Sequence, residues 1–172
     1  MLLFLVGYMG AGKSSIGSGL ANTLGYKFID TDAWIESRCC KSIPDLFNEF
    51  GESFFRAKEK ECIEFLIGKN NYVIATGGGL PCHNDLIELM NELGTTIFLE
   101  ASVQTLSSRL ISASENRPLL PKNKSLAELN YQIKAHLQSR SFLYSKSKNK
   151  VVVDLKSTIQ IQAEILEVLK IK

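Results

Sequence analysis

Residues 7–14 read Gly-Tyr-Met-Gly-Ala-Gly-Lys-Ser and match the pattern G-x-x-x-x-G-K-[ST] in full. In this P-loop pattern the glycines let the backbone curl until successive N–H groups point at phosphate oxygens. Lys13 would reach the outer phosphates, and the Ser14 hydroxyl would ligate Mg²⁺. An apolar run at 2–6 and a helical stretch to Leu24 flank the motif, as a buried strand and a phosphate-facing helix should. We therefore expect a nucleoside triphosphate ligand rather than a coincidental glycine-rich turn.

Short apolar runs alternate with helical patterns along the whole chain. The expected strands are 2–6, 27–30, 72–76, 95–99 and 150–154. The expected helices are 13–24, 33–50 with an interruption around Pro44, 52–67, 84–92, 102–111, 125–145 and 158–170. This alternation predicts an α/β fold with a parallel sheet covered by helices on both faces. Ligands then gather at the carboxyl ends of the strands, here just after residues 6, 30 and 76.

The bulk properties suit one globular domain spanning residues 1–172. A net charge of +2 without a basic run gives no sign of a nucleic-acid partner. No leader and no membrane-spanning apolar stretch is visible, so we expect a cytoplasmic protein and, in addition, a monomer. The cysteines at 39, 40, 62 and 82 lack C-x-x-C spacing and are expected to be free thiols, with Cys62 on the apolar side of a helix.

Two short motifs follow the second and third expected strands. Asp30-Thr31-Asp32 ends the second, where alternation would put both carboxylates on one side. One could act on Mg²⁺ and the other on an acceptor hydroxyl, although solvated turn residues or helix caps would look the same. Gly77-Gly78-Gly79 follows the third strand and would allow a ligand close to the backbone, or form a flexible loop.

Only five of the 20 basic residues are arginines, which are preferred where a planar fork must hold a carboxylate or phosphate. Arg56 can pair with Glu59 three residues later on a helix, either to fix its own orientation or as a plain surface ion pair. Residues 112–124 are polar and twice broken by proline, which indicates a lid carrying Arg117 or a disordered connection. Trp34 is expected to fill core space, and His83 and His136 are assigned no chemistry.

Together these motifs resemble the shikimate kinase family. The ordered set spans residues 7–144 and consists of Gly-Tyr-Met-Gly-Ala-Gly-Lys-Ser, Asp-Thr-Asp, Phe-Phe-Arg-x-x-Glu, Thr-Gly-Gly-Gly, Arg-Pro-Leu-Leu and Arg-x-x-Leu-Tyr. The resemblance implies a P-loop kinase three-layer sandwich with a five-stranded parallel sheet in the order 2-3-1-4-5 and a mobile lid. It also implies transfer of the γ-phosphoryl group of ATP to the 3-hydroxyl of shikimate, on the route to aromatic amino acids. The acceptor would bind within about 31–60.

The same resemblance implies roles for single residues. Asp32 would hold the shikimate hydroxyls as candidate base, Arg56 and Arg140 would grip the carboxylate, and Glu59 would hold Arg56. The glycine loop, Gly77, Gly78 and Gly79, would present N–H groups to shikimate. Lys13 and Arg117 would stabilise phosphoryl charge, Ser14 would ligate Mg²⁺, and Asp30 would act on it through water. The expected ATP-binding residues are Gly10, Ala11, Gly12, Lys13, Ser14, Ser15, Arg109 and Arg117, with Arg109 stacking on adenine.

One departure and three alternatives stand beside this interpretation. Many members of the family carry a proline shortly after the last strand, whereas residues 154–158 here have none. Another small P-loop kinase, such as one acting on gluconate, would not require the Arg56, Gly78-Gly79 and Arg140 set. A nucleotide-dependent switch or a related protein without catalysis belongs to a different class. The protein without catalysis is disfavoured because Lys13, Ser14, Asp30, Asp32 and Arg117 are all present. A GTPase would carry Asn-Lys-x-Asp, which this chain lacks.

Overall fold

A five-stranded parallel sheet forms the centre of the protein. The computed structural model describes residues 1–114 and 126–171. The strands are β1 (Leu2–Val6), β2 (Lys27–Asp30), β3 (Tyr72–Ala75), β4 (Thr95–Glu100) and β5 (Asn149–Val152), in the order β2-β3-β1-β4-β5. This order and the parallel pairing confirm the predicted α/β fold.

The central strand has neighbours on both sides and helices on both faces. Leu5 of β1 is in register with Ala75 of β3 and with Ile97 of β4. All five residues of β1 are buried, which explains why the run is apolar throughout rather than alternating. The P-loop follows β1 directly, so it begins at the middle of the sheet's carboxyl edge.

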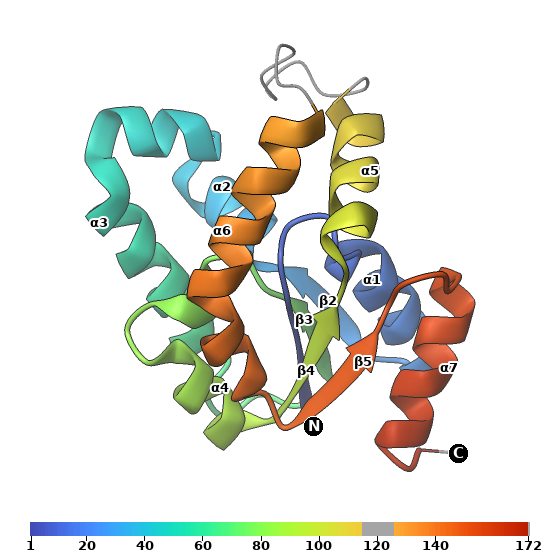
Figure 1. Cartoon of the computed structure of the whole chain (residues 1–172). Coiled ribbons are helices and arrows are strands. Elements are labelled where there is room, and N and C mark those ends of the chain that lie inside the picture. Colours follow the sequence, from blue (N-terminus) through green and yellow to red (C-terminus); the bar gives the residue numbers. More distant parts are fainter. Residues whose placement is uncertain (115–125, 172) are drawn as a thin grey trace.

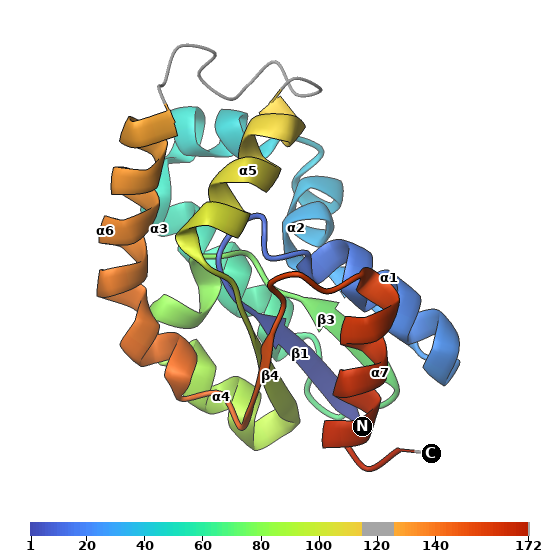
Figure 2. The same cartoon turned by 45° about the vertical axis from the view of Figure 1, so that its right-hand side comes forward.

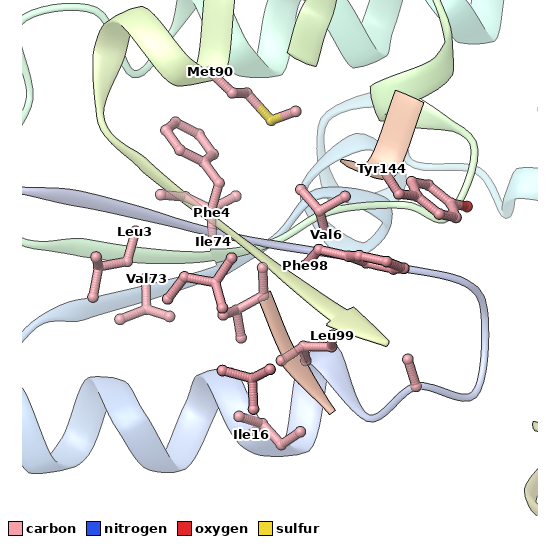
Figure 3. Close-up of a cluster of buried hydrophobic side chains, with 14 of the residues drawn as sticks. Leu3, Phe4, Val6, Ile16, Val73, Ile74, Met90, Phe98, Leu99 and Tyr144 are labelled. Atoms are coloured by element: carbon pink, nitrogen blue, oxygen red, sulfur yellow. The ribbon is translucent and has the colours of Figure 1, made fainter. Parts of the chain in front are cut away.

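Helices complete a three-layer sandwich. Helices α1 (Lys13–Leu24) and α7 (Thr158–Val168) lie on one side of the sheet, and α4 (Leu86–Leu93) and α6 (Leu126–Ser145) lie on the other (Figures 1 and 2). The side chains show the same division, because Phe4 points toward Met90 of α4 while Ile16 of α1 packs below the strands (Figure 3). The sheet is therefore buried on both faces, as a parallel sheet requires.

Helices α2 (Thr31–Cys39) and α3 (Ile43–Glu64) form a separate lobe beside the carboxyl edge (Figure 1). The lobe has its own small apolar cluster around Ile35, Leu46 and Phe55. The expected interruption around Pro44 is confirmed, because α2 ends at Cys39 and α3 begins at Ile43. Pro44 occupies the first turn of α3, where its missing N–H costs nothing. A second break falls at Gly51, between the expected helices 33–50 and 52–67, where a φ of 78° and a ψ of 177° are non-helical.

The segment expected to be a lid differs at its start. Residues 112–114 belong to the end of α5 (Val103–Ser114). The rest of the 112–124 segment lies outside the described residues. A 3₁₀ turn at Leu80–Cys82, which the sequence analysis did not predict, follows the glycine loop.

The four cysteines are free, and Cys62 is fully buried on α3, as predicted. None of the helices in the described part of the chain is long and apolar enough to cross a membrane.

Candidate active site

The P-loop wraps around the amino end of α1 with backbone angles that favour glycine. Gly10 and Gly12 have φ values of 84° and 97°, in the left-handed region. A Cβ atom on Gly7 would lie 2.8 Å from the Leu99 carbonyl oxygen, so the strand next door leaves no space there. The first turn of α1 carries no acidic side chain, and Gly12 supplies no side-chain cap. The N–H groups at this helix end are thus suited to bind an anion.

Lys13 lies almost fully buried beneath this loop, with 8% of its surface exposed. Its ammonium group donates hydrogen bonds to the carbonyl oxygens of Gly7 (2.7 Å) and Tyr8 (2.9 Å). Burial lowers the pKa of Lys13 to about 8, while the charges of Asp32 and Asp30 act in the opposite direction. Phosphate oxygens in the loop would favour the charged ammonium form in the same way.

Asp30 links the P-loop to the lobe. Its Oδ2 accepts a hydrogen bond from the Ser14 hydroxyl at 2.5 Å. Its Oδ1 caps α2 by accepting from the backbone N–H groups of Asp32 (3.1 Å) and Ala33 (3.4 Å). The expectation that Asp30 and Asp32 share one face of a strand is wrong, because the helix begins at Thr31. Both carboxylates nevertheless lie near Lys13.

Asp32 lies partly buried in the first turn of α2, between the P-loop and α3. Burial raises the pKa of its carboxyl group, and the neighbouring charge of Asp30 raises it further. The positive charges of Lys13 and Arg56 oppose this shift. A carboxyl group with a raised pKa beside two cations is suited to hold a hydroxyl group and to accept its proton.

The glycine loop fits tightly against three parts of the site. A Cβ atom on Gly77 would lie 2.6 Å from Oδ1 of Asp32, and one on Gly79 would lie 3.0 Å from an Arg56 nitrogen. One on Gly78 would lie 3.2 Å from the backbone nitrogen of Met9 in the P-loop. The loop is therefore a close approach of backbone to site residues rather than an open flexible connection.

Arg56 is held by two carboxylates of its own helix, α3. It donates to Glu59 Oε2 at 2.8 Å and to Glu52 Oε1 at 2.8 and 3.1 Å. Only 1% of the Glu59 side chain is exposed, so the alternative of a surface ion pair is wrong. The buried Glu59 carboxylate instead fixes the orientation of the Arg56 guanidinium. Burial raises the pKa of Glu59 and Arg56 opposes that rise.

Arg140 and Arg109 both contact the P-loop, Arg140 from α6 and Arg109 from α5. Arg140 of α6 places its guanidinium carbon 5.8 Å from the ring centre of Tyr8 in the P-loop. Arg109 of α5 donates to the carbonyl oxygens of Gly10 (3.3 Å) and Ala11 (3.2 Å), so it supports the P-loop from outside. Its stacking on adenine stays a prediction, and Arg117 lies outside the described residues.

These contacts bring together residues from five separate parts of the sequence. The P-loop, the start of α2, the middle of α3, the glycine loop and α6 meet at the carboxyl edge of the sheet. The site has an anion-binding loop on one side and forked cations on the other, with carboxylates between them. This arrangement suits transfer of a phosphoryl group to an anionic, hydroxyl-bearing acceptor.

Comparison with known proteins identifies the family. The family model described as shikimate kinase matches residues 9–170. A shikimate kinase of Persephonella marina is 40% identical over 164 residues, which cover 95% of this chain and 96% of that protein. The chain belongs to the shikimate kinase family.

Solved structures of shikimate kinases have the same fold. The crystal structure of the Bacteroides thetaiotaomicron shikimate kinase superposes with a TM-score of 0.92 at 36% identity and covers 99% of both chains. The Acinetobacter baumannii shikimate kinase, solved in complex with shikimate, has a TM-score of 0.87 at 29% identity and covers 98% of this chain and 92% of that one. As a member of the shikimate kinase family, the chain is an ATP-using phosphotransferase.

Several contacts in this shikimate kinase fold escaped the sequence analysis. The Thr31 hydroxyl, fully buried, accepts a hydrogen bond from the Gly77 N–H at 2.8 Å and so ties the glycine loop to α2. The Tyr144 hydroxyl donates to the Gly78 carbonyl oxygen at 2.5 Å. His136, to which no chemistry was assigned, is 2.8 Å from the Tyr8 hydroxyl. The sequence contained one indication of these contacts. His136, Arg140 and Tyr144 are spaced by four residues, which places them on the same face of a helix.

Proposed function

We propose that this chain transfers the γ-phosphoryl group of ATP to the 3-hydroxyl of shikimate, giving shikimate 3-phosphate for aromatic amino-acid biosynthesis. The proposal rests on the family and on one observation, the position of Asp32. Its carboxyl group lies within electrostatic reach of Lys13 on the donor side and of Arg56 on the acceptor side. An acceptor held by Arg56 would therefore present a hydroxyl group to Asp32 beside the phosphate loop.

On the donor side, the ATP phosphates would bind to the backbone of the loop and to the residues that follow it. The proposed ATP-binding residues are Gly10, Ala11, Gly12, Lys13, Ser14 and Ser15. The Ser14 hydroxyl and the Asp30 carboxylate are adjacent oxygen donors, which fits Mg²⁺, a hard ion that takes few protein ligands. Ser14 would ligate the ion and Asp30 would act through water. When bound, Mg²⁺ neutralises charge on the β- and γ-phosphates.

On the acceptor side, Arg56 and Arg140 would bind the carboxylate, and the N–H groups of Gly77, Gly78 and Gly79 would face the ring of shikimate. Asp32 would orient the 3-hydroxyl for in-line attack on the γ-phosphorus. As the new P–O bond forms, the bond to the bridging β–γ oxygen breaks and ADP leaves. The hydroxyl proton passes to Asp32 late in the step, because a loose transition state demands little base catalysis.

Lys13 would remain with the transferring group and stabilise its charge. Arg117 would add a second positive charge from the proposed lid, about 112–124, and Arg109 would contact the adenine. Closure over the acceptor makes physical sense because water competes with the alcohol for the phosphoryl group.

We also propose the organisation expected from the sequence. The chain would be a single P-loop kinase domain, 1–172, with its acceptor-binding region at about 31–60. It would act as a cytoplasmic monomer with small-molecule substrates and without nucleic acid or membrane partners.

Acceptor-dependent turnover tests the proposal directly. With ATP and Mg²⁺ present, we expect rapid ADP formation only when shikimate is added, measured in a coupled assay. Lys13→Met serves as the control, because methionine is an unbranched side chain without the phosphate-binding charge, so its shikimate-dependent rate should fall about 100-fold or more. No stimulation by shikimate together with clear stimulation by gluconate would overturn the proposal in favour of another small-molecule kinase.

A further inference from the structure

Three side chains on one face of α6 contact the two loops of the site. His136, Arg140 and Tyr144 recur every four residues and therefore lie one above another along the helix. His136 contacts the P-loop, Tyr144 contacts the glycine loop, and Arg140 lies between them. Helix α6 thus contacts both the donor side and the acceptor side of the site. The two contacting residues, His136 and Tyr144, lie on either side of Arg140, which is proposed to bind the substrate.

The upper contact joins α6 to the P-loop. The Tyr8 hydroxyl and Nδ1 of His136 are 2.8 Å apart, and the two ring centres are 6.0 Å apart. Tyr8 is 4% exposed, so its hydroxyl has given up most of its access to water and depends on this partner. Burial raises the pKa of Tyr8, although Arg140 opposes the rise, which keeps the hydroxyl protonated.

The lower contact joins α6 to the glycine loop. The fully buried Tyr144 donates its hydroxyl proton to the carbonyl oxygen of Gly78, and its ring packs on Phe98 of β4 with ring centres 5.3 Å apart. Burial raises the pKa of Tyr144, so this donor also keeps its proton. The carbonyl group of Gly78 is therefore fixed, and so is the direction of the peptide that follows it.

Arg140 lies between these two contacts, and within residues 1–114 and 126–171 no carboxylate forms an ion pair with it. Its guanidinium carbon lies over the Tyr8 ring at 5.8 Å, a cation–π arrangement, and the same group interacts with the Tyr144 hydroxyl. Arg56, by contrast, is oriented by Glu52 and Glu59. Aromatic rings orient a guanidinium without neutralising it, so Arg140 keeps its charge available for an anion.

We propose that Tyr8, His136 and Tyr144 are positioning residues that hold α6 against both loops and aim Arg140 at the acceptor carboxylate. This inference rests on the proposed function, in which Arg140 binds that carboxylate. The three residues do not touch the reacting atoms. They set the preference of the site for an acceptor that carries a carboxylate.

The test compares shikimate with its carboxamide, which lacks the charge that Arg140 would bind. The variants are Tyr8→Phe, His136→Leu, the double variant and His136→Asn, whose amide takes the place of Nδ1. For Tyr8→Phe and for His136→Leu we expect KM for shikimate to rise about 3- to 10-fold, with kcat changed less than 2-fold and KM for the carboxamide unchanged. The double variant should lose no more than either single variant, and His136→Asn should recover most of the loss.

Two controls separate positioning from general damage. Tyr131→Phe removes a hydroxyl from an exposed part of α6 and should leave every constant unchanged. Equal losses for shikimate and the carboxamide, additive losses in the double variant, or a KM for shikimate unchanged by Tyr8→Phe would each overturn the inference. Tyr144→Phe is measured last, because its burial makes it the variant most prone to unfold.

Arg140→Met distinguishes this inference from the proposed function. If Arg140→Met raises KM for shikimate about 100-fold while the tyrosine and histidine variants have no effect, the positioning role is rejected and the function stands. If Arg140→Met leaves KM for shikimate unchanged, the role of Arg140 in the proposed function is itself wrong, and the positioning role falls with it.

Discussion

At the residue scale, the site depends on the glycine at position 77, where there is no space for a side chain. Gly77 lies where a single methyl group would meet Oδ1 of Asp32 at 2.6 Å and Oε1 of Glu59 at 3.3 Å. Both oxygens end flexible side chains, so an added methyl group would displace them rather than unfold the chain. The requirement for glycine at this position is therefore a requirement of the reaction geometry.

Gly77→Ala should separate activity from stability. We expect kcat to fall about 100-fold, because a displacement of about 1 Å in the group that orients the acceptor costs that much. The melting temperature should change by only a few degrees, measured by thermal unfolding of the same sample. Gly68→Ala is the matched control: its added methyl group has nothing within 4 Å, and although a φ of +75° strains it, kcat should be unchanged. A fully active Gly77→Ala enzyme would contradict the assignment.

Asp32→Asn tests the group placed between donor and acceptor. The amide keeps the shape of the carboxyl group but replaces one acceptor oxygen by an N–H donor and removes the charge. It can neither orient the acceptor hydroxyl in the same way nor take its proton, so we expect kcat to fall by about 10²- to 10⁴-fold. Binding of ADP, measured by calorimetry, should be no weaker, because the change removes a negative charge near the phosphate loop. A normal kcat would show that Asp32 neither orients nor deprotonates the acceptor.

The two interpretations of Asp30 show why single residues are hard to assign from sequence. A helix cap and a metal-site residue were alternatives, yet Oδ1 caps α2 while Oδ2 accepts from Ser14. Each oxygen of one carboxylate has its own partner, which a pattern of letters cannot express. Glu59 and Arg56, by contrast, were predictable, because a spacing of three residues on a helix fixes their distance.

At the scale of elements, local signals placed most helices and strands, and long-range contacts set their ends. The expected strand at 150–154 ends at Val152, because only Asn149–Val152 pairs with β4. The expected break around Pro44 is the gap between α2 and α3, and the expected boundary at residue 51 is a kink inside α3. Proline is tolerated in a first helical turn, whereas the angles at Gly51 belong to a region that essentially only glycine adopts.

The bend at Gly51 leads to a prediction on the lobe. Gly51→Asn should lower the free energy of unfolding by about 1–3 kcal/mol, measured by urea denaturation. The φ and ψ of residue 51 lie in a region that is strained for every residue with a side chain, asparagine included. Gly25→Asn is the control, since Gly25 has φ 65° and ψ 29°, a left-handed conformation that asparagine tolerates. Equal stability of the two variants would contradict the explanation of the bend.

The buried thiol on α3 gives the protein a specific alkaline sensitivity. Burial raises the pKa of Cys62 to about 12, from an ordinary value of 9.0. Between pH 9 and 12 the unfolded chain therefore loses this proton while the folded chain keeps it, so stability falls as the pH rises, by up to about 1.4 kcal/mol per unit. Well below pH 9, where the thiol is protonated in both states, the group adds no pH dependence.

Cys62→Val should remove this slope. From pH 8 to pH 10, the free energy of unfolding of the parent should fall by about 1 kcal/mol more than that of the variant, measured in urea at both values. Cys39→Val leaves Cys62 in place and should follow the parent. Identical slopes for the parent and Cys62→Val would show that the buried thiol has no part in alkaline unfolding.

At the scale of the molecule, the parallel sheet followed from the alternation of strands and helices, but the strand order came from the family resemblance. The lobe's own apolar cluster around Ile35, Leu46 and Phe55 was not foreseen, because its members are distributed over two helices that meet only after folding. The same reason hid the link between α6 and the two loops. Contacts between residues more than 60 positions apart, such as Tyr8 with His136, leave no periodic signal in the sequence.

The central position of β1 also determines when the protein can fold during its own synthesis. Leu2–Val6 is synthesised before the other four strands of the sheet, whereas its neighbours β3 and β4 begin at Tyr72 and Thr95. At a synthesis rate of about 5–20 residues per second, roughly 4–14 s pass between the synthesis of β1 and that of β3, the first strand that can pair with it. Nascent chains stopped before residue 72 should therefore remain open to protease, whereas those extended beyond β4 should gain protection. The strand that carries the phosphate loop is thus made before the other four strands and cannot pair until β3 follows it.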